Sequence, residues 1–175
     1  MRIINGLAPH YYRGEIAGTV LVNGKDNAGR EIHEIAGDAG TLFQDPEHQF
    51  FTLSVEDELA FGQERRCVSP SGIRTIVLEM IERFSLKKVM HSNIFDLSEG
   101  EKQKIALASV ISLQPRVIIP DEPSANLDPG ATEKLASILA DLKQNGITII
   151  IVDHRLCWLS RLIDRVCVLQ HDFKL

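Results

Sequence analysis

Two neighbouring carboxylates follow a short apolar run in the last third of the chain. Asp121 and Glu122 come shortly after residues 117–119, and an apolar run of this length indicates a buried strand. In a parallel sheet both acids would lie at the carboxyl edge, where α/β proteins bind ligands. At phosphoryl-transfer sites the first such carboxylate helps to hold Mg²⁺, and a second polar group orients water. A solvated strand end explains these two acids equally well when they are taken alone.

A second candidate is the predicted start of a helix at Ser98. The sequence from Ser98 to Glu101 has the Ser-x-x-Glu pattern of a capping box, which predicts a helix N-terminus. Such an N-terminus, here with Gly100 in its first turn, is also an anion site, because its free N–H groups and its dipole favour negative charge. The capping interpretation and the phosphate-binding interpretation are compatible.

Two further polar residues complete the set. Gln44 lies in a polar loop after residues 40–43, and His154 follows the apolar run 147–152. A loop glutamine or a lone histidine is more often structural than catalytic. Gln44 and His154 become candidates when their order along the chain is considered together with the acids and the capped helix. Each follows a predicted strand, as the acids do, and the carboxyl ends of parallel strands share one sheet edge.

The middle of the chain is predicted to be helical. Apolar residues recur with a period near 3.6 over 55–61, 71–84 and 98–113, which is typical of amphipathic helices. We therefore expect residues 52–113 to form a helical subdomain.

The last third of the chain alternates between the two periodicities. The predicted order is strand 117–119, helix 130–145, strand 147–152, helix 157–164 and strand 165–169. Alternating strands and helices are the pattern of an α/β fold with a parallel sheet. The core of this fold would comprise residues 1–51 and 114–175.

The first residues of the chain carry two local signals. Residues 19–22 followed by Asn23 and Gly24 predict a hairpin, because type I′ turns need positive φ at both central residues. Residues 1–7 are typical of the end of a helix, with Gly6 as its C-terminal cap.

Composition limits the class of function. The net charge of −5 disfavours sequence-independent binding of nucleic-acid phosphates. The apolar runs are shorter than the roughly 20 residues of a membrane-spanning helix. The three cysteines match no zinc or disulfide spacing, which suits a reducing compartment, and we expect them to be small buried side chains.

The candidate residues lie in motifs that resemble one family along nearly the whole chain. Residues 40–46 resemble the Q-loop, 97–103 the signature motif, 121–123 the end of the Walker B strand, 124–128 the D-loop, and His154 the switch histidine. On these motifs the chain resembles the nucleotide-binding subunits of ATP-binding-cassette (ABC) transporters. Residues 43–51 and 55–62 look most like the energy-coupling-factor branch, whose ATPases drive import of vitamins or transition-metal ions.

The resemblance implies a P-loop NTPase-like fold, with a RecA-like ATPase core, and ATP and Mg²⁺ as cofactors. Asp121 would bind Mg²⁺ through water, and Glu122 would polarise the attacking water. His154 would contact the γ-phosphate, and Gln44 would touch both the metal and the water.

The family pairs two ATPase subunits head to tail around two ATP molecules. By resemblance, Ser98 and the amide of Gly100 would hold the γ-phosphate of the partner's ATP, and Glu101 and Asp128 would also belong to the nucleotide site. A transmembrane transporter subunit would be the other partner, which places the chain at the cytoplasmic face of the cell membrane. The adjacent pair Phe50 and Phe51 would either pack between the lobes or contact that subunit.

The sequence departs from the family pattern in three respects. Gly24-Lys25 is the only Gly-Lys pair, and Asp26 follows it where the phosphate-binding loop needs Ser or Thr. We therefore expect the chain to begin inside the family fold, without the phosphate-binding loop. At the position of Pro120 the family usually has an apolar residue, which carries a backbone N–H. Glu99 and Glu101 stand where Gly and Gln are commoner in the family.

Two alternatives to a transport ATPase remain at this stage. The first is a non-catalytic fragment or degenerate copy that binds a transporter component and supplies Ser98 and Gly100 to a partner's ATP. The second is an ABC ATPase of DNA repair or translation, which the acidic single cassette disfavours.

Overall fold

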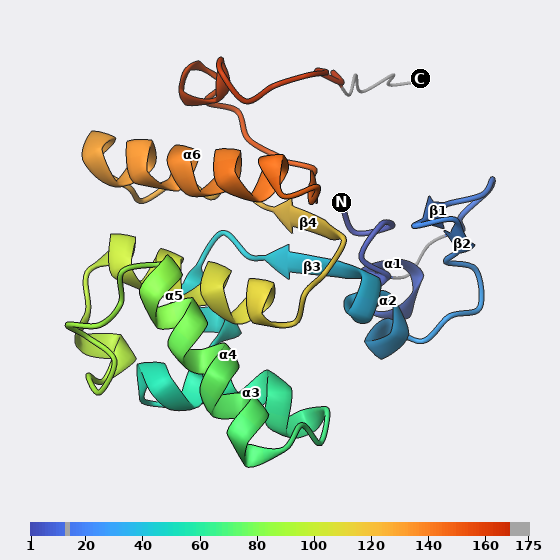
Figure 1. The fold of residues 1–175 in the computed structure, drawn as a ribbon. Helices are drawn as coiled ribbons and strands as arrows, with labels where there is room; N and C mark the ends of the chain where they lie inside the picture. Colours follow the sequence, from blue (N-terminus) through green and yellow to red (C-terminus); the bar gives the residue numbers. More distant parts are fainter. Residues whose placement is uncertain (13–14, 169–175) are drawn as a thin grey trace.

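A three-stranded parallel sheet forms the centre of the structure, a computed structural model that describes residues 1–12 and 15–168. The strands are β3 (Ala39–Leu42), β4 (Val117–Pro120) and β5 (Thr148–Ile149), in the order β3-β4-β5. A separate antiparallel hairpin is formed by β1 (Leu21–Val22) and β2 (Lys25–Asp26). Figure 1 shows the sheet between this hairpin and the group of helices α3 to α5. The predicted α/β fold with a parallel sheet is confirmed.

The helices of the middle segment agree with the predicted periodicity. They are α3 (Val55–Arg65), α4 (Pro70–Arg83) and α5 (Glu99–Ser112), with the short 3₁₀ segment η2 (Ile94–Asp96) before α5. The side chains of Ser54 and Ser69 accept backbone hydrogen bonds at the starts of α3 and α4, which satisfies N–H groups that have no partner within the helix. The division into core and helical subdomain stays a prediction.

The remaining helical elements frame the sheet. They are α1 (Leu7–His10), α2 (Ile32–Asp38), η1 (Pro46–Gln49), α6 (Pro129–Gln144) and η3 (Cys157–Leu159). The sequence analysis did not predict α2, because this helix has only two large apolar side chains at helical spacing, Ile32 and Ile35. Its stability comes from a capping box between Glu31 and Glu34 and from burial of Ile35.

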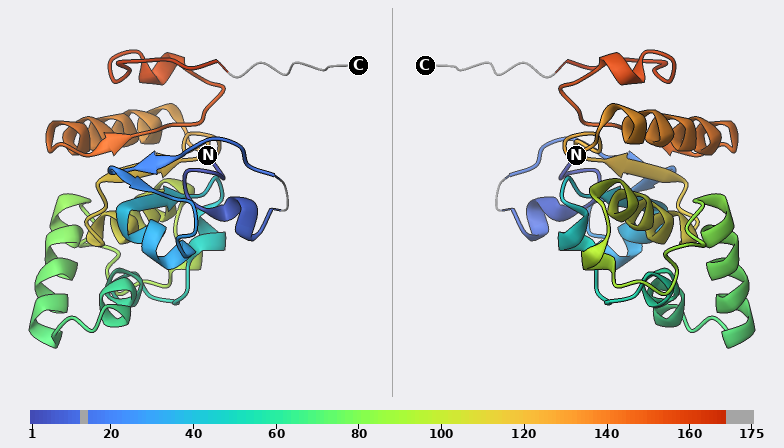
Figure 2. Two further views of the ribbon diagram at one scale, coloured as in Figure 1. Left: turned by 90° about the vertical axis from the view of Figure 1, so that its right-hand side faces the viewer. Right: turned by 90° about the vertical axis from the view of Figure 1, so that its left-hand side faces the viewer.

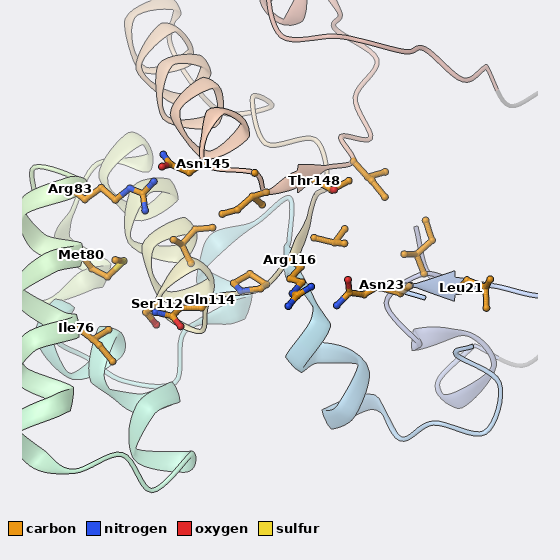
Figure 3. A pocket seen from close by; sticks show the side chains of 18 of the residues that line it. Leu21, Asn23, Ile76, Met80, Arg83, Ser112, Gln114, Arg116, Asn145 and Thr148 are labelled. Carbon is orange, nitrogen blue, oxygen red and sulfur yellow. The ribbon is translucent and has the colours of Figure 1, made fainter. Parts of the chain in front are cut away.

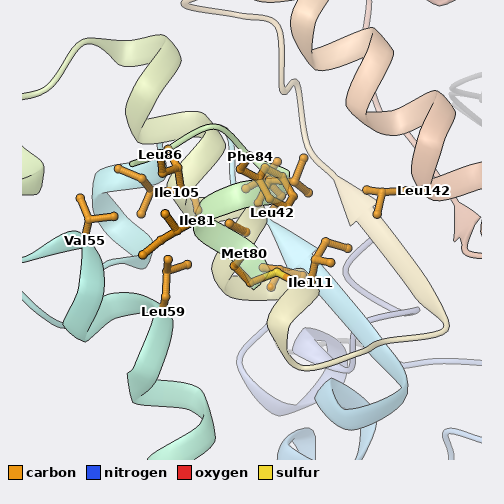
Figure 4. Packing of buried hydrophobic residues seen from close by; sticks show 14 of the residues in the cluster. Leu42, Val55, Leu59, Met80, Ile81, Phe84, Leu86, Ile105, Ile111 and Leu142 are labelled. Carbon is orange, nitrogen blue, oxygen red and sulfur yellow. The ribbon is translucent and has the colours of Figure 1, made fainter. Parts of the chain in front are cut away.

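One buried apolar cluster joins the helices to one face of the sheet. Leu42 of β3 and Ile118 of β4 belong to this cluster together with residues of α3, α4, α5 and α6. Figure 4 shows side chains such as Leu59, Met80 and Ile111 converging on this region. Burial of such side chains supplies about 1.5–3 kcal/mol each, so this cluster fixes α5 and α6 against the strands that carry the candidate site.

The opposite face of the sheet is covered by the first residues of the chain. Ala39 and Ile119 pack there with Val22, Met1 and Ile4. The hairpin is confirmed with its predicted turn, since Asn23 has φ 55° and Gly24 has φ 76°. Gly6 has φ 77°, but residues 2–6 form turns and Gly6 precedes the short helix α1, so the prediction that residues 1–7 end a helix was wrong.

Pro120 shortens the pairing between β4 and β5. The carbonyls of Ile118 and Pro120 accept from the amides of Ile150 and Val152 (2.9 and 3.0 Å), but proline has no N–H to return to β5. Regular pairing therefore ends at Ile149 and resumes as a single bridge between Asp121 and Val152. The predicted strand 147–152 is thus corrected to Thr148–Ile149, for this reason.

The prediction for the last residues was wrong. Only Cys157–Leu159 is helical, as a 3₁₀ turn, and residues 165–168 have no regular secondary structure; Leu169, the end of the predicted strand, lies outside the described residues. Lys143 of α6 instead holds this segment by bonds to the carbonyl of Leu162 (2.9 Å) and to Asp164 (2.6 Å). Figure 2 shows the segment running over α6. A strand needs a hydrogen-bonded neighbour, and none of the described strands lies beside residues 165–168.

Two more observations concern the chain as a whole. Cys67, Cys157 and Cys167 are all exposed, so the expectation of buried thiols was wrong; Cys67 occupies a left-handed turn after α3 (φ 55°) rather than a helix interior. In the described part of the chain, no helix combines the length and the apolar character needed to span a bilayer.

Candidate functional site

The predicted catalytic residues lie in three loops at one edge of the sheet. The amide of Asp121 donates to the carbonyl of Leu42 (2.9 Å), and the amide of Glu122 donates to that of Val152 (2.7 Å). Gln44 is two residues beyond Leu42, and His154 is two residues beyond Val152. The carboxyl ends of β3, β4 and β5 therefore bring Gln44, the two acids and His154 to one place, as the sequence predicted.

Glu122 and His154 contact each other across two of these loops. Nδ1 of His154 lies 3.3 Å from Oε1 of Glu122, and the side chains are 71% and 29% exposed. Glu122 has φ 42°, a left-handed conformation that is uncommon for a residue other than Gly, Asn or Asp. Both side chains are accessible to a ligand at this edge.

Asp121 has the electrostatic character of a cation ligand. Partial burial, and next the neighbouring charge of Glu122, raise the pKa of Asp121, although the N-terminal ammonium and Arg2 act in the opposite direction. No hydrogen-bond donor of a described residue reaches its side chain. A partly desolvated carboxylate beside a second acid is stabilised by a divalent cation, and oxygen ligands of this kind suit Mg²⁺. The residues present therefore fit the metal that the family implies.

Gln44 is exposed in a loop that is fixed by its neighbours. Oε1 of Gln49 accepts the amide of Phe43 (3.2 Å), and Nε2 of Gln49 donates to the carbonyl of Ala106 in α5 (3.3 Å). Gln44 itself makes no hydrogen bond to a described residue. Gln49 was not among the predicted site residues, although it lies in the same polar run as Gln44.

The start of α5 is the predicted capping box. The hydroxyl and the amide of Ser98 both donate to Oε2 of Glu101 (2.6 and 3.0 Å), and these two bonds hold the pKa of Glu101 below its usual value. The anion at this helix terminus is thus the chain's own carboxylate. Phosphate oxygens could accept a hydrogen bond from the Ser98 hydroxyl only if its bond to Glu101 were broken.

Gly100 places the starts of α5 and α6 side by side. A Cβ atom at Gly100 would lie 3.2 Å from the Cβ of Ala131 in α6, so a side chain there would crowd α6. Asp128 is exposed and caps α6 through Oδ1, which accepts the amide of Ala131 (2.9 Å). Ser98, Gly100 and Asp128 therefore lie on one part of the surface.

Two buried residues that the sequence analysis missed connect these groups. Nε2 of Gln103 donates to the carbonyl of Pro123, directly after the acids (3.2 Å). Nζ of Lys102 pairs with Glu47 of η1 (2.5 Å) and with Glu99 (3.2 Å), and the bond to Glu47 is the main reason why the pKa of Lys102 is raised. Nothing in the sequence near the start of α5 indicated that these two polar side chains would be buried.

A large cleft lies away from this chemistry. It has a volume of about 1030 Å³ and opens at the amino edge of the sheet, between the hairpin and α4; Figure 3 shows Asn23 and Arg116 on one side and Ile76 and Met80 on the other. None of the predicted site residues lines it. Its size therefore does not identify the site.

A smaller cleft lies beside the Q-loop. It has a volume of about 320 Å³ and is lined by Phe43, Phe51 and Phe61 among others. Phe51 is 76% exposed and stacks on Phe61 with ring centroids 4.9 Å apart. Phe50 packs against the core and against Phe95, so the two members of the Phe50–Phe51 pair have different environments.

Known proteins resemble the chain in sequence and in fold. A profile of the family described as ABC transporter matches residues 1–125. An ABC transporter ATP-binding protein of Treponema denticola is 41% identical over 170 residues, covering 97% of the chain and 35% of that protein. One of Saccharolobus solfataricus is 35% identical over 168 residues, covering 96% of the chain and 32% of that protein. The chain thus spans about a third of the length of such curated relatives.

A solved structure supports the same assignment. CbiO1 of Clostridium perfringens, described as part of the ABC transporter complex CbiONQ, superposes with a TM-score of 0.77 at 29% identity. The match covers 89% of the chain and 61% of CbiO1. With the parallel sheet and the loops described above, these matches show that the chain belongs to the ABC transporter family and corresponds to its ATP-binding domain.

Proposed function

We propose that the chain belongs to an ATP-hydrolysing subunit that couples ATP hydrolysis to the import of a small solute, a vitamin or a metal ion. The single observation that carries the proposal is the meeting of Gln44, Asp121, Glu122 and His154 at the carboxyl edge of one parallel sheet. This arrangement combines a cation ligand, an acceptor for the proton of water and a donor for phosphate oxygens.

Each residue has a role that follows from its position. Bound Mg²⁺ would neutralise charge on the transferred phosphoryl group. Asp121 and Gln44 would hold that ion, since the carboxylate lacks a donor among the described residues and the amide side chain is free in its loop. Glu122 would accept a proton from the attacking water, and the exposed imidazole of His154 would orient toward the γ-phosphate.

A second ATPase subunit, either a copy of this chain or a related protein, follows from the remaining residues. Ser98, Gly100, Glu101 and Asp128 lie at the adjoining starts of α5 and α6, on a surface that a head-to-tail partner could approach. In this proposal they contact the nucleotide bound by the partner. The Ser98 hydroxyl would then donate its hydrogen bond to phosphate oxygens instead of to Glu101.

A transmembrane subunit is the other proposed partner. The apolar cleft beside Gln44, with Phe51 at its rim, suits an apolar segment of such a subunit. The CbiO1 neighbour is described as part of a multi-subunit transporter, which supports this partner and an energy-coupling-factor type of import. The chain would then lie peripherally at the cytoplasmic face of the membrane, with residues 1–51 and 114–175 as core and residues 52–113 as helical subdomain.

The test uses the protein isolated from its own cells with its membrane subunits. Phosphate release with MgATP should be stimulated by the transported solute or its binding component, and Glu122→Gln should abolish release while ATP binding persists. Undiminished release by Glu122→Gln would contradict the proposed role.

A non-catalytic chain that supports a partner's nucleotide is the second candidate function. It is favoured by Lys25, the lysine of the only Gly-Lys pair, which sits in the hairpin and pairs with Asp38 (3.2 Å) instead of facing the acids. The intact mass of the native protein separates the two. A mass well above 19.5 kDa would favour the ATPase, and a mass of 19.5 kDa would favour the non-catalytic chain.

A further inference from the structure

We propose that Asp153 is a positioning residue, which holds Glu122 in its left-handed conformation by tying the loop after β4 to the loop after β5. The inference rests on the proposed function for its catalytic meaning, because Glu122 is the proposed proton acceptor. The structural part can be tested without nucleotide.

The starting observation is the backbone of Glu122. A positive φ in a residue with a Cβ costs of order 1 kcal/mol or more and persists only when surrounding contacts fix it. Glu122 has φ 42°, and its amide donates to the carbonyl of Val152 (2.7 Å). Beyond the bond from the Val152 amide to Pro120 at the end of β4, this is the backbone bond that joins the two loops, and side-chain contacts are needed to keep them in register.

The carboxylate of Asp153 supplies those contacts. Oδ2 accepts the hydroxyl of Ser124 (2.8 Å) and the indole N–H of Trp158 (3.3 Å), and Oδ1 accepts the amide of Arg155 (2.7 Å). Ser124, two residues after Glu122, is only 1% exposed. Three donors from two loops thus converge on one acidic side chain.

The guanidinium of Arg155, in the loop after β5, also binds Ser124 in the loop after β4. It donates to the carbonyl oxygen and to the hydroxyl of Ser124, the latter at 3.2 Å. The network contains the residue directly before His154 and the residue two after Glu122. It is therefore placed to set the 3.3 Å approach of His154 to Glu122.

An amide side chain cannot replace this carboxylate. Asn has one acceptor oxygen and one NH₂ group, so in either orientation of its amide Asp153→Asn would point N–H groups at a donor, either the indole N–H of Trp158 or the backbone amide of Arg155. Ser124→Ala removes one donor and leaves the Asp153 side chain in place. The two variants break the same connection from opposite sides, and Glu133→Gln on the exposed face of α6 is the matched charge control.

The experiment is hydrogen exchange by NMR on the full chain, with two adjacent amides compared. The Glu122 amide donates to the loop after β5, whereas the Asp121 amide donates to Leu42 of β3. Loss of about one hydrogen bond should speed exchange of the Glu122 amide about tenfold in Asp153→Asn and Ser124→Ala. Exchange of the Asp121 amide should change less than about twofold, and Glu133→Gln should change neither.

Trp158 gives an independent signal, because it is the only tryptophan of the chain. Its emission should shift in Asp153→Asn, which replaces the carboxylate that the indole N–H faces by a neutral amide, and should remain close to wild type in Glu133→Gln. Equal acceleration of the Asp121 and Glu122 amides would show that the network only supports general stability, and unchanged exchange of Glu122 would show no link; either result overturns the proposal. Failure to bind or hydrolyse ATP would bear on the proposed function and would leave this comparison unaffected.

Discussion

His154 and Glu122 face each other at 3.3 Å although 32 positions separate them along the chain. Each lies shortly after the end of a different strand, and β4 and β5 are neighbours in the sheet. The contact is therefore a product of the sheet topology. Since His154 is 71% exposed, the pair contributes little to folding, and its position at the edge fits a functional role.

The first prediction separates function from stability at Glu122. Glu122→Gln should lower phosphate release by the assembled transporter at least about 100-fold, because the amide cannot accept the water proton. Its effect on the free energy of unfolding should stay below about 1 kcal/mol, since exposed ion pairs contribute little. Steady-state phosphate assays and urea unfolding measure the two quantities. A variant that lost activity only in proportion to unfolding would assign Glu122 a structural role.

The second prediction concerns the burial of Asp121. Its pKa is raised above the ordinary value of 3.8, so its ionised form destabilises the fold at neutral pH, and this penalty is lost as the pH falls from the raised pKa of the folded state to the ordinary value. Asp121→Asn should raise the melting temperature at pH 7 by at least about 2 °C and should leave it unchanged near pH 3. Differential scanning fluorimetry at both pH values is the measurement, with Glu133→Gln as control. A lower melting temperature at pH 7 would contradict this account.

The third prediction concerns the bonds between Ser98 and Glu101, where the pKa shift has the opposite direction to that of Asp121. The pKa of Glu101 is lowered by its bonds to Ser98, so the stabilisation is present above the ordinary value of 4.5 and is lost as the pH falls through the lower pKa of the folded state. Ser98→Ala should cost about 1 kcal/mol at pH 7. Urea unfolding should show this cost shrinking toward pH 3. A cost independent of pH would mean that the hydroxyl acts without Glu101.

The sequence predicted where the candidate site residues lie better than it predicted the end of the fold. Gln44, Asp121, Glu122 and His154 could be placed at one edge because strand order along the chain and parallel topology dictate it. The effect of Pro120 on β5 depends on which side of β4 the missing N–H would have pointed. That information lies in the register and not in local composition.

The buried polar contacts could not be predicted from the sequence, because they also depend on tertiary structure. Lys102 and Gln103 are the fourth and fifth residues of α5, and side chains of these two types are mostly exposed. Their burial results from η1 and the segment at Pro123 lying against α5, which is a tertiary arrangement. The failure of the predicted strand 165–169 is similar, because apolar composition alone cannot supply the neighbouring strand that hydrogen bonding needs.

The last prediction tests whether Lys102 needs both of its carboxylate partners. The Lys102 side chain is 8% exposed, whereas Glu47 and Glu99 are 40% and 45% exposed. Glu47→Gln or Glu99→Gln alone should cost at most about 1 kcal/mol, because the other carboxylate keeps the buried ammonium paired. The double variant should cost about 3 kcal/mol, since it leaves that charge without a partner.

A double-mutant cycle by urea unfolding at pH 7 measures the coupling between the two acids, which should be at least about 1 kcal/mol. Lys102→Met is the complementary variant, and it should cost less than the double variant because both carboxylates can be hydrated once the lysine is gone. The raised pKa of Lys102 means that its contribution is fully present at pH 7 and declines only above its ordinary value of 10.5. Simple additivity of the two single variants would show that Lys102 does not connect η1 to the start of α5.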